Sequence, residues 1–189
     1  PNQGCLSEGN LPLMLPHHEC AVERLVAHFS ALPECEAIII GGSVAKGYER
    51  PDSDIDFQMV VPPEVFEQRL AEQDVFLYGT DIVGYEGGYH DGKVIDKPFL
   101  LDVAERGSEV ARAAFVKAYV PYSKDPEIPD IVARCAQYPE HEREEKLRTF
   151  YAHFSLWCWF VGEAEKRQDP YLLTQAAGSV SLYAGRLFL

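Results

Sequence analysis

The stretch that decides the fold is GGSVAKGYERPDSDIDF, residues 41–57. It follows residues 36–40, a short run rich in β-branched side chains that predicts a buried strand. Two glycines end that strand, and residues 43–46 can form a helical turn. From Asp54 to Val61, polar and apolar side chains alternate, which predicts a second strand with one buried face. The order is therefore strand, glycine turn, short helix and strand.

Two carboxylates begin the second predicted strand. Asp54 and Asp56 are separated by one residue, so the two-residue period of a strand places them on one face, roughly 7 Å apart. Neighbouring carboxylates repel each other, and a shared divalent cation relieves that repulsion. The sequence thus predicts a metal site at the beginning of this strand.

The glycine turn before the carboxylates is typical of a phosphate site. Gly41 and Gly42 allow a backbone to approach a ligand closely. Backbone N–H groups at the helix start and the Ser43 hydroxyl can hold phosphate oxygens. Lys46, one turn further, can add positive charge. We expect Gly42, Ser43 and Lys46 to bind the phosphates of a nucleotide.

These features resemble the DNA-polymerase-β-type nucleotidyltransferase superfamily. Its signature is a Gly-Ser turn, a spacer of about ten residues and an Asp-x-Asp pair. Gly42-Ser43, ten intervening residues and Asp54-Ile55-Asp56-Phe57 match each position, and Ser53 matches the usual Ser-Asp-x-Asp. The resemblance covers about residues 21–125. It implies an α+β fold, with a mixed β-sheet flanked by helices and followed by a C-terminal helical segment.

The resemblance also implies a site. The family uses a third carboxylate on a neighbouring strand, and Asp96 in the predicted strand 92–97 is our first choice. Asp102 is the runner-up, and Asp81 and Asp91 are weaker candidates. The expected catalytic and metal-binding residues are Asp54, Asp56 and Asp96. The expected nucleotide-binding residues are Gly42, Ser43, Lys46 and Ser53. The resemblance implies two Mg²⁺ ions as cofactors and ATP or another nucleoside triphosphate as co-substrate.

The rest of the chain divides into two regions. Residues 1–16 are expected to form an irregular lead-in. Before residue 126, the patterns predict helices at 17–32, 63–73 and 107–117, and strands at 81–86, 92–97 and 118–122. After it they predict only helices, at 128–137, at 140–167 and from 170 to the end. We therefore expect a catalytic domain at 1–125 and a helical domain at 126–189.

Composition narrows the function. Thirty acidic and 17 basic residues give a net charge of −13, which disfavours a nucleic-acid partner. An acidic cleft would favour a cationic acceptor. Five cysteines without a CxxC pair indicate a reduced, cytoplasmic setting without structural zinc. No apolar run approaches the roughly 20 residues that span a bilayer, and no signal peptide is visible, so no membrane partner is expected.

The resemblance points to the small-molecule branch of the superfamily, in which helices after the catalytic domain complete the cleft. That branch implies transfer of a nucleoside monophosphate to a hydroxyl of a small molecule, aminoglycoside- or lincosamide-like, with release of pyrophosphate. One alternative is an antitoxin or regulator of the minimal nucleotidyltransferase type that adenylylates a protein. A non-catalytic nucleotide-binding module is another. A homodimer and a separate general base also stay open.

Overall fold

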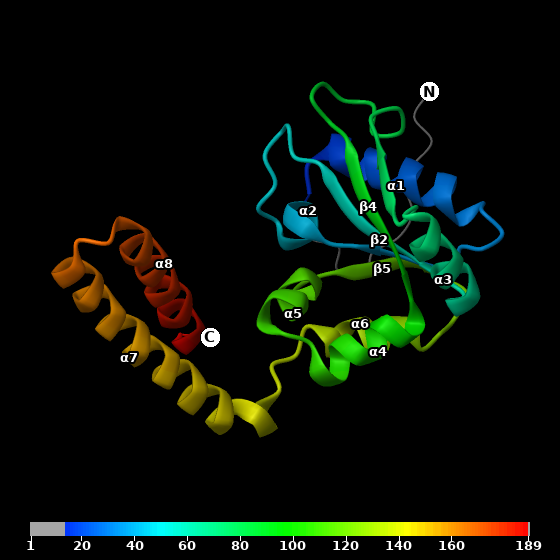
Figure 1. Cartoon of the computed structure of the whole chain (residues 1–189). Coiled ribbons are helices and arrows are strands. Elements are labelled where there is room, and N and C mark those ends of the chain that lie inside the picture. Colours follow the sequence, from blue (N-terminus) through cyan, green and yellow to red (C-terminus); the bar gives the residue numbers. More distant parts are fainter. Residues whose placement is uncertain (1–13, 189) are drawn as a thin grey trace. The chain divides into compact units, whose positions relative to one another are not determined.

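A computed structural model describes residues 14–188 (Figure 1). The first part contains α1 (Pro16–Ser30), β1 (Ala37–Ile40), α2 (Gly42–Lys46), β2 (Ile55–Val61), α3 (Pro63–Glu72), β3 (Phe76–Gly79), β4 (His90–Asp96), α4 (Lys97–Arg106), α5 (Glu109–Phe115), β5 (Tyr119–Ser123) and α6 (Ile128–Cys135). The second part contains a 3₁₀ turn, η1 (Glu140–Glu142), then α7 (Arg143–Arg167) and α8 (Pro170–Leu187). Most of the predicted N-terminal lead-in lies outside the described residues.

The chain forms two compact units that divide between Gln137 and Tyr138. Helix α6 falls within the first of them. The expected division into a catalytic domain at 1–125 and a helical domain at 126–189 stays a prediction.

A mixed five-stranded sheet lies at the centre of the first unit, with the order β3-β4-β2-β1-β5. β2 and β4 run parallel, and the other neighbouring pairs run antiparallel. Helices cover both faces of the sheet: α1 lies on one side and α4 to α6 on the other (Figure 1). The expected α+β class with a C-terminal helical segment is confirmed.

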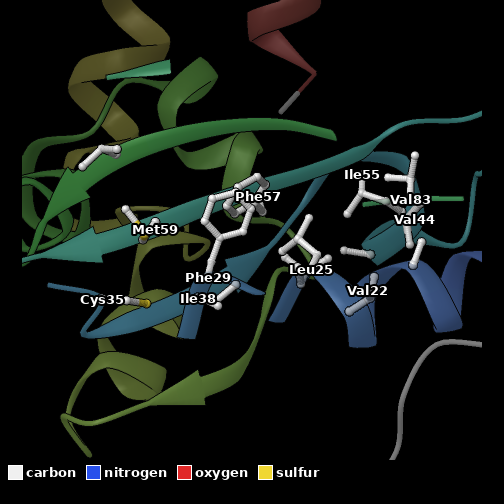
Figure 2. Close-up of a cluster of buried hydrophobic side chains, with 14 of the residues drawn as sticks. Val22, Leu25, Phe29, Cys35, Ile38, Val44, Ile55, Phe57, Met59 and Val83 are labelled. Atoms are coloured by element: carbon white, nitrogen blue, oxygen red, sulfur yellow. The ribbon is translucent and has the colours of Figure 1, made fainter. Parts of the chain in front are cut away.

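Both faces of β1 are buried, which explains its uninterrupted isoleucines. Ile38 packs into the cluster under α1, where Leu25 and Phe29 meet Phe57 of β2 (Figure 2). Ile39 points the other way, into a second cluster with α4, α5 and α6. Each fully buried side chain of this size contributes roughly 1.5–3 kcal/mol relative to exposure. These clusters hold β1 and β2 rigidly, and the candidate site begins where the two strands meet α2.

The strand predicted at 81–86 is wrong. These residues form turns, and the strand that pairs with β4 at this edge of the sheet is β3, at Phe76–Gly79. The apolar residues of this segment suggested a strand, but they belong to a loop that packs on the core. Val83 is fully buried in the cluster under α1. The Arg24 guanidinium donates to the Val83 carbonyl oxygen at 2.8 Å and anchors this loop to α1.

Helix α4 was not predicted. It begins directly after β4, with Asp96 as its N-cap and Pro98 in its first turn. The prediction of a strand over 92–97 therefore ended one residue too late and started two residues too late, because β4 spans His90–Asp96. The difference between the predicted and the observed bounds of this strand changes which carboxylates it contains, because β4 includes Asp91.

The second unit is a pair of long helices, α7 and α8, which pack against each other. Asp169 caps α8 by accepting from the Leu172 N–H at 3.0 Å, and Pro170 begins the helix. Among the helices of residues 14–188, none is long and apolar enough to cross a membrane.

Candidate nucleotide-binding site

The glycine turn is hydrogen-bonded to β2, the strand that contains Asp56. The Gly41 N–H donates to the Asp56 carbonyl oxygen at 3.0 Å. Gly42 has φ +65°, a conformation that favours glycine. A Cβ placed on Gly42 would lie 1.8 Å from Oδ2 of Asp56. The missing side chain therefore makes room for the Asp56 carboxylate, a role that the sequence analysis did not foresee.

Three carboxylates lie at the same end of the neighbouring strands β2 and β4. Asp56 of β2 pairs in register with Asp91 of β4, and Asp54 lies directly before β2. Paired residues of neighbouring strands present their side chains on the same face. Burial raises the pKa of Asp56, and the negative charges of Asp54 and Asp91 raise it further. This end of the sheet thus concentrates negative charge around a half-buried carboxyl group.

The structure does not bring Asp96 to this group. In the register of β2 and β4, Asp96 lies opposite Val61, five residues beyond Asp91. Five residues of strand correspond to about 16 Å. The Asp96 side chain is buried and accepts from the Phe99 N–H at 2.8 Å, which caps α4. Asp96 therefore stabilises the start of α4. The position expected for Asp96, on the strand beside Asp56, is occupied by Asp91.

The runner-up carboxylates also lie elsewhere. Asp102 is exposed on α4 and pairs with Arg106 one turn along the helix. Asp81 is exposed in the turn after β3. Of the candidates for a third carboxylate, the register selects the one that the sequence analysis ranked among the weakest.

Two of the predicted nucleotide-binding residues, Ser43 and Ser53, line a small open pocket of about 310 Å³. Its lining residues come from α2, from the loop before β2 and from the position directly before β4: Ser43, Tyr48, Arg50, Asp52, Ser53, Asp54 and Tyr89. Lys46 lies close enough to counter the rise in the pKa of Asp56 through its positive charge. The structure therefore brings Ser43, Ser53 and Asp54 to one pocket, with Lys46 near Asp56.

Ser53 has a structural task beside this pocket. Its hydroxyl accepts from the Arg50 N–H at 2.9 Å, and its own N–H donates to the Arg50 carbonyl oxygen at 3.0 Å. These two bonds close the turn that delivers Asp54 to the strand. With its hydroxyl engaged in this way, Ser53 orients the loop before the carboxylates.

Two tyrosines that the sequence analysis missed hold the same loop. The Tyr85 hydroxyl donates to the Ser53 carbonyl oxygen, and burial raises the pKa of Tyr85 to about 12. The Tyr89 hydroxyl is hydrogen-bonded to Asp54, which raises the pKa of Tyr89. Tyr85 lies in the segment predicted as the strand 81–86, and Tyr89 lies between the strands predicted at 81–86 and 92–97. No local pattern marked either tyrosine as a partner of the loop before Asp54.

The donor chemistry of this site fits a divalent cation. Carboxylate oxygens are the ligands that Mg²⁺ prefers, and the raised pKa of Asp56 reflects the repulsion that a cation would relieve. Within residues 14–188, however, no three His, Cys, Asp or Glu side chains are placed to hold one metal ion together. The donors therefore share one end of the sheet without being gathered around a single point.

Comparison with known proteins agrees with the fold and the motif. Residues 22–109 match the family model described as "Nucleotidyltransferase domain". A nucleotidyltransferase-like protein from Exiguobacterium sibiricum 255-15 has a similar crystal structure, with a TM-score of 0.50 and 11% identity. The alignment covers 88% of this chain and 55% of that one, so the chain spans about half the length of this neighbour.

At such low identity, the structural likeness shows a shared fold alone. No curated protein matches the chain. The family match contains the glycine turn and all three carboxylates of the site. That match, on a fold that agrees with it, supports the placement of residues 22–109 in the nucleotidyltransferase superfamily.

Proposed function

We propose that this protein transfers a nucleoside monophosphate from ATP or another nucleoside triphosphate to a hydroxyl of a small molecule. The observation that carries the proposal is the contact of the Gly42 backbone with the Asp56 carboxylate, which pairs across the sheet with Asp91. A phosphate-binding turn and a metal-binding pair are thereby joined at one point. The net charge of −13 supports a small acceptor over a nucleic acid.

In this proposal, the chain's own groups bind and orient the nucleotide. Ser43 and the first N–H groups of α2 hold the phosphates, and Lys46 adds charge. Mg²⁺ ions on Asp54, Asp56 and Asp91 would neutralise the phosphates and acidify the acceptor hydroxyl. The hydroxyl oxygen releases its proton to water and forms a bond to the α-phosphorus as the bond to pyrophosphate breaks. Positioning and charge neutralisation supply most of the rate in such transfers.

The test is titration calorimetry of ATP and GTP, with and without Mg²⁺, into the wild type and an Asp54→Ala/Asp56→Ala variant. We expect Mg²⁺-dependent binding that disappears in the variant. The matched control is Asp102→Ala/Asp130→Ala, which removes two exposed carboxylates of the same unit away from the site. If the wild type binds no nucleotide, or if both double variants bind equally, the proposal is refuted.

A second prediction separates Asp91 from Asp96. We expect Asp91→Asn to weaken Mg²⁺-dependent ATP binding about tenfold, because an amide is a poor magnesium ligand. Asp96→Ala should leave that affinity unchanged. It should instead lower the free energy of unfolding by about 1 kcal/mol, because α4 loses its N-cap. Calorimetry and urea denaturation measure the two effects, and the reverse pattern would return Asp96 to the site.

No feature of residues 14–188 favours a protein-adenylylating regulator or a non-catalytic binding module over this proposal. The intact carboxylates support transfer, because nucleotide binding alone does not require three of them.

A further inference from the structure

The outer side of β3 is open for strand pairing. β3 lies at one end of the five-stranded sheet, and among residues 14–188 only β4 pairs with it. The Val94 N–H donates to the Val75 carbonyl oxygen at 2.9 Å, so these two residues form a hydrogen-bonded pair. Hydrogen-bonded and non-hydrogen-bonded pairs alternate along an antiparallel ladder. The backbone N–H and carbonyl groups of Phe76 and Tyr78 therefore point away from β4, toward the open side.

The same two residues carry exposed aromatic side chains. Phe76 is 66% exposed and Tyr78 is 68% exposed. They pair with Lys93 and Asp91 of β4, so both rings lie on the face of the sheet that carries the candidate site. Leu77, between them, packs against the cluster under α1 on the opposite face. Exposed apolar surface and unpaired backbone groups thus coincide at the same two positions.

The two edges of the sheet differ in their protection. β5, at the other edge, carries Pro121 at its centre, and its register with β1 shifts between Ile38 and Ile40. Proline offers no N–H, and proline, bulges and charged side chains keep edge strands from pairing with other chains. β3, with the sequence Phe-Leu-Tyr-Gly, has none of these three. The edge at β3 is therefore able to accept another strand.

The pattern of β3 is complementary to itself. An antiparallel copy centred on Leu77 places Phe76 opposite Tyr78 of the partner subunit, and Tyr78 opposite the partner's Phe76. The outward backbone groups of these residues then exchange hydrogen bonds, and each ring gains an aromatic neighbour across the strands. This register also sets Asp74 opposite Thr80 of the partner subunit. The pairing therefore brings no like charges face to face beside the strand.

We propose that two copies of this chain pair through β3, so that their sheets join into one continuous sheet with a two-fold axis perpendicular to it. Such an axis keeps both candidate nucleotide-binding sites on one face of the joined sheet. It also brings Phe76 of the partner subunit beside Tyr78, which pairs with Asp91. The inference does not depend on the proposed function, because it rests on the backbone and the rings of β3.

The small size of the contact sets its expected strength. A phenylalanine or tyrosine side chain has roughly 200 Å² of surface, so the four rings of a dimer, each about two-thirds exposed, can bury at most about 500 Å². Complexes that bury less than about 1,200 Å² in total are weak and transient. We therefore expect a concentration-dependent dimer with a dissociation constant on the order of 10–100 µM.

Sedimentation velocity of the full chain, from about 1 µM to about 500 µM, measures this association. Two charge variants test the register: Phe76→Lys/Tyr78→Lys and Phe76→Glu/Tyr78→Glu. Each alone sets like charges directly opposite one another in a homodimer, and an equimolar mixture sets opposite charges there. Tyr78→Pro removes an N–H that points away from β4, so the pairing of β3 with β4 keeps its hydrogen bonds. The control is Tyr171→Lys, which adds a charge at a 79%-exposed tyrosine of α8.

We expect the wild type and Tyr171→Lys to dimerise with the same affinity. Each charge variant alone should associate at least about tenfold more weakly, and their mixture should recover the wild-type affinity within about threefold. Recovery in the mixture shows that the variants are folded and that their charges meet across the interface. Tyr78→Pro should be monomeric throughout. If that variant does not fold, the charge variants and their mixture decide the result.

Three results would overturn the proposal. The first is a wild type that stays monomeric to about 500 µM, well above the expected dissociation constant. The second is a mixture of the two charge variants that remains monomeric, because opposite charges would then not meet at this edge. The third is a dimer that Tyr171→Lys dissociates and the charge variants keep, which would assign the interface to α8 instead of β3.

Discussion

Replacing Asp56 with asparagine is expected to weaken Mg²⁺-dependent ATP binding on the order of 100-fold while making the nucleotide-free protein more stable. Asp56 is half-buried, and burial together with Asp54 and Asp91 raises its pKa. The ionised form is thus unfavourable in the folded chain. Asparagine removes that charge with little change of shape, so we expect the melting temperature to rise by a few degrees at neutral pH.

The pH dependence of this effect has a definite sign. The folded chain holds the Asp56 proton more tightly than the unfolded chain does, so ionisation of Asp56 costs stability as the pH rises through its folded pKa. The advantage of the Asp56→Asn variant should therefore shrink as the pH falls and the wild-type carboxyl is protonated. Calorimetric melting at several pH values measures it, with Asp130→Asn on α6 as the matched exposed control. A variant less stable than the wild type at neutral pH would contradict the charge argument.

Replacing Gly42 with alanine has the second largest expected effect. The new Cβ would lie 1.8 Å from the Asp56 carboxylate, so either Asp56 or the turn must move. Because both belong to the proposed site, we expect ATP binding to be lost along with stability. The measurements are calorimetry for binding and urea denaturation for the free energy of unfolding.

Gly47 supplies a close control for this substitution. It also has a positive φ, +72°, but nothing lies within 4 Å of a Cβ built there. Gly47→Ala should cost about 1 kcal/mol through backbone conformation alone and leave ATP binding near the wild-type value. If the two alanine variants lost stability and binding equally, the contact with Asp56 would not be the cause.

The parts of the site that the sequence predicts are those encoded locally. The turn, the short helix and the strand that carries Asp54 and Asp56 follow one another within residues 41–61, and periodicity places them. The third carboxylate depends on how β4 pairs with β2, a long-range register that no local pattern contains. β4 begins two residues earlier than predicted and so includes Asp91, and its register with β2 places Asp91 beside Asp56.

The missed loop and edge strand have a related cause. Val83 has the burial of a strand residue, but it reaches the core from a turn that Arg24 fastens to α1. Hydrophobicity reports burial and does not report the backbone conformation that achieves it. Tyr85, which orients the segment before Asp54, was therefore assigned to a strand, and Tyr89 to the connection between two predicted strands.

The parallel pairing of β2 with β4 also bears on how the protein folds. A long connection, which contains α3 and β3, separates β2 from β4 and must close before Asp91 can pair with Asp56. Such long-range parallel contacts form late, because the chain loses the entropy of the closed connection before any contact between the two strands stabilises it. We therefore expect a nucleotide to have little influence on early refolding. A bound nucleotide should instead lower the unfolding rate. The ligand-bound protein should then resist proteolysis longer, although it does not fold faster.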